Sequence, residues 1–459
     1  MAGRQLKIVV IGSGIAGLAA SLAFAREGHR VLLIERDGAP PPATADESFL
    51  EWDRPGVPQR RLLHGFLPLA RRLLLANLPD VVERLVAAGA HHVDQLAVVV
   101  NREDRPGDEQ LFVLRSRRTV FEWVLRQVVD EEPGVSLRAG ETVSGLLGDQ
   151  LTTTGVRLRS GGRVESDLVV DASGRRSGVL GWLQQLGATL PREDTAPCGL
   201  VYFSRFYRHR DPDLPVAYRD NLEYSQVSAA AGDGNTFCLT FFARAEEHGL
   251  RLLRQEAAFE RAVAAIEGLR PWRDRATPLG PVNAMGTLNN SIRRFVIDGR
   301  PVTSGLLLIG DTLTHTNPSL GRGMSLGLDH AFRAARIPWR DLPMTEGALD
   351  YHSQVDPMAE ASYKDAVALE SLNRRAYAGE AGAREEPRAV LQRAVRLAPA
   401  WDQDLFRANL RDVGLLQPPG WIESEPWISR ARALLERNRD APSKGPDLER
   451  MLAILEDRA

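Results

Sequence analysis

Three glycines and one glutamate near the start of the chain have the types and spacing to hold a dinucleotide. Gly12, Gly14 and Gly17 form a G-x-G-x-x-G pattern, and Glu35 follows it. The first glycine permits a tight turn, the second admits a pyrophosphate close to the backbone, and the third lets helix and strand pack closely. A carboxylate can accept both hydroxyl protons of a ribose. Because a carboxylate also repels a 2′-phosphate, Glu35 favours FAD or NAD over NADP.

The segments around these residues have the periodicities of a strand–helix–strand unit. Residues 6–11 are apolar and β-branched, as in a strand buried on both faces, and an apolar helix follows and stops at Gly28. Residues 31–34 predict a second strand that ends on Glu35. The helix start would offer unpaired N–H groups and a partial positive charge to phosphates. The unit predicts a dinucleotide site, and the alternative is a set of glycines that only shapes a turn.

Two later strands also end in glycine-containing turns. Residues 167–170 lead into Asp171 and Gly174, a second place where backbone could approach a cofactor. Residues 305–309 are the last predicted strand of the parallel sheet. A turn rich in glycine follows that strand and precedes a helix, which is typical of an anion or ring site. This turn contains Gly310, Asp311, Pro318, Gly321 and Gly323, and the helix starts near Met324.

Basic and imidazole side chains supply further candidates. Arg54 lies in a proline-containing basic loop that could reach a phosphate or could be a solvated surface loop. Arg118 precedes an amphipathic helix predicted over 119–131, where a cation is disfavoured unless an anion is near. His64 and His315 are the candidates for general acid or base, and a structural role is the alternative for each.

The rest of the chain shows different patterns of apolar and polar residues. We expect a strand at 96–100 and a small antiparallel excursion formed by four short strands at 135–166. Residues 198–294 alternate apolar and polar positions, which indicates an antiparallel sheet with a helix at 253–267 inside it. Its aromatic residues could line an apolar pocket or fill the sheet core. Residues 346–459 read as helices without recognisable chemistry that cover the site, pack on the first domain or form a dimer contact.

The composition is that of a globular protein of 459 residues, with 43% hydrophobic and 26% charged residues. A net charge of −2 gives no electrostatic case for nucleic acid or an anionic membrane. The first strand begins almost at once and no apolar run is long enough to span a membrane, so we expect a cytoplasmic protein. Cys198 and Cys238 are not spaced for a metal, and we expect two reduced thiols and no metal site.

Taken together, these segments resemble the FAD-dependent aromatic hydroxylase superfamily of single-component flavin monooxygenases. The resemblance is carried by residues 6–36, 54–65, 114–126, 167–177 and 305–328. The stretches RPGVPQ-x-x-x-x-H, SR-x-x-x-x-x-W and DASGRRS look closest to bacterial polyketide hydroxylases and polyether epoxidases. Leu62 stands where that branch often carries the first histidine of an H-x-H pair, and His64 occupies the second position.

The resemblance implies an α/β fold: a Rossmann-like FAD-binding domain, an inserted antiparallel-sheet substrate domain and a helical C-terminal region. The corresponding boundaries are 1–185 with 296–345, then 186–295, then 346–459. It assigns the FAD site to Gly12, Ser13, Gly14, Ile15, Ala16, Gly17, Glu35, Arg36, Arg54, Arg118, Val143, Asp171, Gly174, Gly310, Asp311, Pro318, Gly321, Gly323 and Met324. With a single G-x-G-x-x-G pattern, electrons would come from transiently bound NAD(P)H or from a partner flavin reductase.

The function implied by the resemblance is insertion of one oxygen atom from O₂ into an apolar or aromatic small molecule by way of a flavin C4a-hydroperoxide. Hydroxylation and epoxidation share that chemistry. One alternative is a flavin-dependent reductase of a lipid or isoprenoid double bond, and another is a non-catalytic FAD-bound scaffold. A halogenase is disfavoured, because W-x-W-x-I-P is absent and Lys7 is the only lysine before Lys364. We expect a monomer or homodimer. An arginine excess over lysine and a high alanine content suggest a GC-rich bacterial genome, and the resemblance to polyketide hydroxylases implies secondary metabolism.

Overall fold

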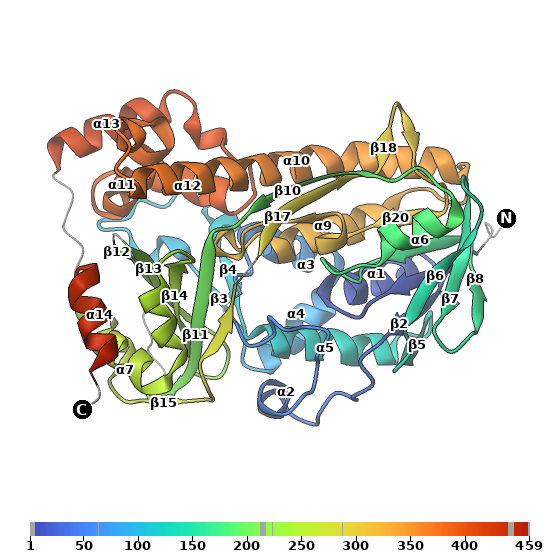
Figure 1. Ribbon diagram of the computed structural model, residues 1–459, viewed down its shortest axis with the longest axis horizontal. Coiled ribbons are helices and arrows are strands. Elements are labelled where there is room, and N and C mark those ends of the chain that lie inside the picture. Colours follow the sequence, from blue (N-terminus) through green and yellow to red (C-terminus); the bar gives the residue numbers. More distant parts are fainter. Residues whose placement is uncertain are drawn as a thin grey trace.

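Five parallel strands form the sheet on which the nucleotide unit is built, and in four of them the leucine, isoleucine and valine runs are buried on both faces, while the edge strand β5 is largely exposed. The computed structural model describes residues 5–62, 64–211, 217–222, 224–286, 288–438 and 445–457. The strand order is β20-β9-β1-β2-β5. The bounds are β1 (Lys7–Ile11), β2 (Arg30–Glu35), β5 (Val135–Ala139), β9 (Leu168–Asp171) and β20 (Leu306–Leu308). This sheet and the N-terminus lie on the right of Figure 1.

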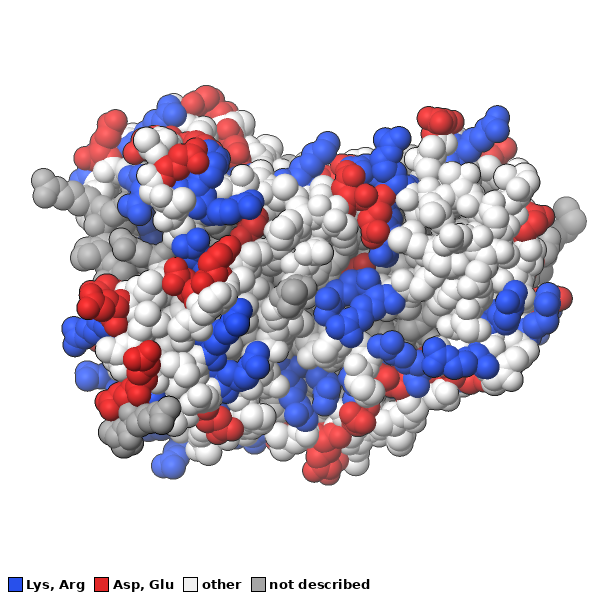
Figure 2. All heavy atoms as spheres, viewed as in Figure 1, with Lys and Arg blue, Asp and Glu red and all other residues white. Residues whose placement is uncertain are grey.

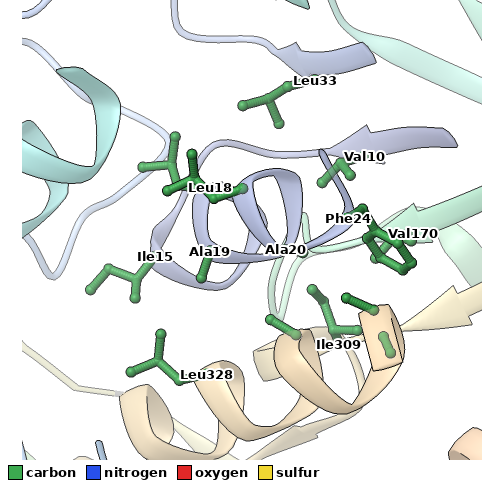
Figure 3. Packing of buried hydrophobic residues seen from close by; sticks show 14 of the residues in the cluster. Val10, Ile15, Leu18, Ala19, Ala20, Phe24, Leu33, Val170, Ile309 and Leu328 are labelled. Carbon is green, nitrogen blue, oxygen red and sulfur yellow. The ribbon is translucent and has the colours of Figure 1, made fainter. Parts of the chain in front are cut away.

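Helix α1 (Ile15–Arg26) is apolar almost all round because it packs against helices as well as against the sheet. It contacts both α5 (Arg118–Glu131) and α9 (Gly323–Arg336). Leu18 and Phe24 of α1 point toward the strands and α9, as Figure 3 shows. A three-stranded antiparallel sheet, β6 (Val143–Gly148), β7 (Thr153–Leu158) and β8 (Arg163–Glu165), packs against β9, and α6 (Val179–Leu186) packs on β6.

A second, antiparallel sheet occupies the left half of Figure 1. Its order is β12-β13-β14-β11-β15, and β16 also pairs with β11. The strands are β11 (Leu200–His209), β12 (Ala217–Leu222), β13 (Ser225–Ala231), β14 (Thr236–Arg244), β15 (Ala276–Pro278) and β16 (Asn283–Met285). One face is covered by α7 (Glu256–Ala264) and α14 (Leu448–Glu456), with α8 (Arg270–Arg273) nearby. Phe203, Phe237 and Phe241 fill the core on that face.

The two halves are joined by a small sheet of order β10-β17-β21, made of β10 (Arg192–Pro197), β17 (Asn289–Arg294) and β21 (Thr314–His315). Helix α10 (Met344–Tyr377) runs along the top of both halves in Figure 1, and α11, α12 and α13 gather beyond it. These helices span Pro387–Trp401, Gln403–Val413 and Trp427–Arg437. The remaining elements are α2 (Ala45–Leu50), α3 (Pro68–Asn77), α4 (Pro79–Ala87), β3 (His91–Val93), β4 (Val113–Arg115), β18 (Val296–Ile297) and β19 (Arg300–Pro301).

The fold class expected from the sequence is confirmed, with two local corrections. The strand expected at 96–100 is wrong: Gln95–Val98 forms a 3₁₀ turn, which the Asp94 side chain caps by accepting the Leu96 N–H at 2.9 Å. The first strand of the expected antiparallel excursion is also wrong, because β5 pairs in parallel with β2 at the edge of the main sheet. No described helix is long and apolar enough to cross a bilayer.

Candidate active site

One cavity of about 1420 Å³ lies between the main sheet, the antiparallel sheet and the C-terminal helices. Drug-sized pockets span roughly 300–1,000 Å³, so this cavity has room for a dinucleotide and a second molecule. Most of the residues that the sequence assigns to a cofactor or to catalysis line it. They are Gly12, Gly14, Ile15, Ala16, Glu35, Arg36, His64, Arg118, Val143, Gly174, Gly310, Asp311, His315, Pro318, Gly321, Gly323 and Met324. Ser13, Gly17, Arg54 and Asp171 are not among its lining residues.

The glycine turn between β1 and α1 divides into crowded and open positions. Gly12 has φ +95°, and a Cβ there would meet the Ala172 carbonyl oxygen at 2.9 Å. A Cβ on Gly17 would lie 1.9 Å from the Gly12 carbonyl oxygen, so helix and turn are in backbone contact. Gly14 is different: a Cβ there would meet nothing within 4 Å. The space beside Gly14 at the start of α1 is therefore open to a ligand, and no side chain caps this helix.

Glu35 ends β2 at the cavity wall and is buried. Its carboxylate accepts hydrogen bonds from the backbone N–H and the hydroxyl of Ser13, both at 2.7 Å, and from the Asp37 N–H at 2.9 Å. Burial raises the pKa of Glu35, but the Arg54 charge and these hydrogen bonds outweigh it, and the pKa lies below its ordinary value. The acid is ionised, as an acceptor of ribose hydroxyls must be.

Arg54 is buried behind the glycine turn and touches three carboxylates. Its guanidinium lies 3.0 Å from Glu122, 3.3 Å from Glu35 and 3.4 Å from Asp37. Opposite charges on three sides raise the pKa of Arg54 despite its burial. The structure thus places Arg54 where it fixes Glu35 and the turn.

Arg118, the first residue of α5, faces the cavity and pairs with Glu122 at 3.3 Å. His64 lies beside it. The Arg118 guanidinium is 3.4 Å from His64 Nε2, and His64 Nδ1 is 2.9 Å from the Leu62 carbonyl. A neutral ring that donates from Nδ1 and accepts at Nε2 satisfies both contacts. Burial and the Arg118 charge lower the pKa of His64 to about 3, so the imidazole stays uncharged near neutral pH.

The two later turns meet at the same end of the cavity. Asp171 is fully buried and accepts from the Ser173 N–H at 2.9 Å and the Ser173 hydroxyl at 2.6 Å. The Gly174 N–H donates to the Thr312 hydroxyl at 2.9 Å, which joins the turn after β9 to the turn after β20. Helix α9 starts at Gly323 without a side-chain cap, and both Gly323 and Met324 face the cavity. His315 is held through Nδ1, 2.8 Å from the Asn289 carbonyl.

Several cavity residues were missed by sequence reasoning because the C-terminal helices were read as lacking chemistry. Glu370 of α10 lines the cavity, and its carboxylate accepts from the Asn317 amide at 3.2 Å. Tyr202 of β11 donates to the same amide's oxygen at 2.5 Å. Burial raises the pKa of Glu370 to about 7. Helical spacing of the cavity residues in α10 is the signal that could have found this face: Asp365, Leu369, Glu370, Asn373, Arg374 and Tyr377.

Aromatic residues of the antiparallel sheet serve both of the purposes left open by the sequence. Tyr202 and Phe242 line the cavity, while Phe203, Phe237 and Phe241 lie in the core on the opposite face. Cys198 and Cys238 are buried free thiols. Within the described ranges, no group of three or more histidine, cysteine or acidic side chains could hold a metal ion.

Comparisons with known proteins agree with this site. The family model described as FAD dependent oxidoreductase matches residues 7–226. Protein Rv3254 of Mycobacterium tuberculosis is 28% identical over 370 residues, 72% of each chain. Kynurenine 3-monooxygenase of Salinispora arenicola is 25% identical over 417 residues, 80% of this chain and 84% of that one.

Solved structures show the same fold at low sequence identity. The flavin-dependent brominase Bmp2 superposes with a TM-score of 0.59 at 18% identity, covering 95% of this chain and 99% of that one. PqsL, a probable FAD-dependent monooxygenase from Pseudomonas aeruginosa, has a TM-score of 0.58 at 16% identity, covering 82% and 99%. The fold is that of the aromatic-hydroxylase-type flavoproteins. The family-model match and the shared fold support an oxidoreductase enzyme.

The residues present fit FAD. The turn leaves open space at Gly14 where a pyrophosphate would approach the start of α1, and the ionised Glu35 stands at the cavity wall. At the other end of the same cavity, the uncapped start of α9 offers N–H groups to a ring that gains negative charge on reduction.

Proposed function

We propose that the chain is an FAD-dependent monooxygenase that inserts one oxygen atom of O₂ into an apolar or aromatic small molecule by hydroxylation or epoxidation. The observation that carries the proposal is a single cavity that joins the nucleotide turn to the face of the antiparallel sheet. The second oxygen atom leaves as water. When bound, reduced FAD supplies the two electrons and activates O₂.

In this proposal the chain's own residues bind, orient and exclude water. Gly14 and the start of α1 hold the pyrophosphate, Glu35 the adenosine ribose, and Asp311 a ribityl hydroxyl. The α9 N-terminus stabilises the negative charge of the reduced ring. Arg36, Arg118 and Val143 line the path of the cofactor, and the turns carrying Asp171, Gly174 and Pro318 enclose the ring. Tyr202 and Phe242 provide an apolar wall for the substrate.

We assign His64 and His315 to the vicinity of the reacting ring, with proton transfer as their proposed role. Because the pKa of His64 is lowered to about 3, its imidazole is uncharged and only weakly basic at neutral pH, so it would hold an accepted proton only transiently. His315 is nearly buried and is oriented by the Asn289 carbonyl.

The finer assignments are also proposals. Electrons come from transiently bound NAD(P)H or from a partner flavin reductase, since the sequence holds one dinucleotide turn. The protein acts in the bacterial cytoplasm, in secondary metabolism, as a monomer or homodimer without a nucleic acid partner. Two relatives from bacteria support the source. The proposed domains are 1–185 with 296–345 for FAD, 186–295 for substrate and 346–459 as a helical region.

The cofactor assignment is tested by Gly14→Ala. Because the added methyl group meets nothing within 4 Å, the melting temperature of the FAD-free variant should equal that of the wild type. Its affinity for FAD, measured by titration and the visible spectrum, should fall about 10-fold or more, since the methyl group occupies the approach of the pyrophosphate. Gly181→Ala, which is equally open but outside the cavity lining, is the matched control. Equal FAD affinity in all three proteins would contradict the assignment.

The reaction class is tested with photoreduced holoenzyme, isotope-labelled O₂ and aromatic candidates, with mass spectrometry of the products. Gain of one labelled oxygen atom per product supports the monooxygenase. Reduction of an alkene under anaerobic conditions would instead identify a reductase. A protein that takes up no FAD would overturn the proposal.

A further inference from the structure

A row of polar residues crosses the cavity face of the antiparallel sheet. Arg219 of β12 pairs with Ser228 of β13, Ser228 with Thr240 of β14, and Thr240 with Ser204 of β11. Residues directly opposite each other on paired strands share one face of the sheet. All four line the cavity. We call Arg219, Ser228, Thr240 and Ser204 the polar stripe.

The polar stripe has both apolar and polar neighbours on this wall, and Gln226 and Asn221 lie in the same row as Phe242. Phe242 lies two residues after Thr240 on β14, and its partner Tyr202 lies on β11. Ala230 lies two residues after Ser228 on β13, in the opposite direction. All three residues line the cavity. The hydroxyls of Ser204 and Thr240 are 2.8 Å apart and satisfy each other. Ser228 is 7% exposed, and within the described chain its hydroxyl has no hydrogen-bond partner. A buried hydroxyl without a partner is costly, so this one is set to meet a ligand.

Arg115 of β4 enters the same cavity with its charge uncompensated. Its buried Nε has no hydrogen-bond partner, and no carboxylate of the described residues forms an ion pair with Arg115 or with Arg219. Burial lowers the pKa of Arg115 to about 10, yet the guanidinium remains charged at neutral pH. Arg117, two residues later, does have acidic partners: it forms ion pairs with Asp233 and Asp46.

Arg117 also fixes where β4 meets the sheet. Its backbone N–H donates to Asp233 at 2.6 Å, and Asp233 follows the end of β13. At that end Ala230 pairs with Ala217, two residues from Arg219. Arg117 thus ties β4 to the end of β13, and Arg115 and the polar stripe line the same cavity. Lys and Arg side chains gather in the middle of the face shown in Figure 2.

The proposed phosphate site beside Gly14 is linked to other arginines. Arg118 turns to His64 and to Glu122, and Glu122 contacts Arg54 beside Glu35 and the glycine turn. Arg115 lies instead on β4, whose partner strand β3 places His91 opposite it. A planar guanidinium with no acid of its own matches a carboxylate through two parallel N–H···O bonds.

We propose that Arg115 and the polar stripe bind a carboxylate of the substrate, which makes the substrate an apolar or aromatic carboxylic acid. The inference rests on the proposed function for the identity of the bound molecule as substrate. Arg115 supplies the charge, the Ser228 hydroxyl donates a hydrogen bond to a carboxylate oxygen, and Arg219 approaches from the edge strand. Tyr202 and Phe242 contact the apolar part.

The test compares three carboxylates with their uncharged amides: benzoate and benzamide, 2-naphthoate and 2-naphthamide, decanoate and decanamide. Binding to FAD-loaded enzyme is measured by calorimetry, and FAD content is read from the visible spectrum of each sample. At least one carboxylate should bind about 10-fold or more tightly than its amide, since charged hydrogen bonds are the stronger ones. That preference should disappear in Arg115→Met and shrink severalfold in Ser228→Ala.

Matched controls come from the same chain. Arg84→Met removes a surface arginine paired with Glu131, and Ser225→Ala removes a serine of β13 on the opposite face of the strand. Both should keep the full preference. Arg115→Met should leave the melting temperature of the ligand-free protein close to that of the wild type, because the half-buried Arg115 forms no ion pair among the described residues. If Arg115→Met does not fold, Ser228→Ala and Arg219→Met carry the test.

Three results would overturn the inference. The first is that no carboxylate binds more tightly than its amide. The second is that the preference survives in Arg115→Met. The third is that Arg115→Met loses FAD while keeping the preference, which would assign Arg115 to the cofactor. Failure of the proposed function has a different signature: a protein without flavin bands, or without oxygen transfer, that still prefers carboxylates.

Discussion

Two arginines of this protein, one buried and one half-buried, have opposite surroundings. Arg54, behind the glycine turn, touches three carboxylates, whereas Arg115, on the cavity wall near the antiparallel sheet, touches none among the described residues. Because carboxylates of the chain itself neutralise the Arg54 charge, Arg54 has a structural role. A charge left uncompensated in a cavity is the property expected of a residue that meets a ligand. Arg54 thus belongs to a network of neutralised charges, and Arg115 keeps a charge that no described carboxylate neutralises.

The largest expected effect on stability comes from replacing Arg54, whose charge three carboxylates neutralise. Arg54→Met leaves Glu35, Asp37 and Glu122 buried beside an apolar side chain, and removal of one partner of a buried ion pair costs about 3–5 kcal/mol. The free energy of unfolding, measured by urea denaturation, should fall by that amount. Arg84→Met, at an exposed pair, is the control. A loss no larger than the control's would mean that Arg54 does not hold the turn together.

An intermediate effect, on the pH dependence of stability, is expected from Glu370, which lines the cavity. Its pKa is raised from an ordinary 4.5 to about 7, so between these values the folded protein binds more protons than the unfolded chain. This contribution to stability is present at low pH and is lost as the pH rises through about 7. Glu370→Gln cannot ionise, and its advantage in melting temperature should therefore grow from pH 5 to pH 8.

The control for this titration is Glu436→Gln, on the exposed face of α13. Melting curves of the wild type and both variants at several pH values suffice. The groups around Glu370 that can shift its titration are Arg374, Arg244 and Glu246. An advantage of Glu370→Gln that stays constant with pH would contradict a raised pKa.

The smallest effect, on the titration of a single side chain, is expected at His64, which lies beside Arg118. Burial and Arg118 hold its pKa at about 3, so its imidazole should show no change of charge between pH 5 and pH 8. The ring nitrogen shifts in an NMR titration, assigned with His64→Gln, should be flat over this range. A midpoint near the ordinary histidine pKa of about 6.5 would show that the Arg118 contact is absent in solution.

The sequence was most informative where the structure is local. The turn from β1 to α1 and the acid at the end of β2 lie within a few dozen residues, and their spacing alone predicts the nucleotide site. The 3₁₀ turn at 95–98 was misread because a run of small apolar residues is typical of a strand, while one capping bond from Asp94 decides otherwise.

The substrate end depends on contacts between distant segments, which no local pattern specifies. The polar stripe exists only because four strands adopt one register, and a slip of one residue would turn Ser228 to the other face. Arg115 and Arg117 have the same residue type two positions apart, yet only the tertiary contact with Asp233 separates the paired one from the unpaired one. Glu370 reaches the cavity because α10 crosses from one half of the molecule to the other.

Helix α10 also has a mechanical consequence. With 34 residues and a rise of 1.5 Å each, it is about 50 Å long, with Pro357 inside it. Near one end the Tyr351 hydroxyl donates to the Leu308 carbonyl of the main sheet, and farther along Asp365 pairs with Arg322 at 2.6 Å and Glu370 with Asn317. All three partners lie between Leu308 and Arg322, so these bonds fasten both sides of Pro357 to the half that carries the main sheet. A hinge motion between the halves would therefore carry most of α10 along with the main sheet.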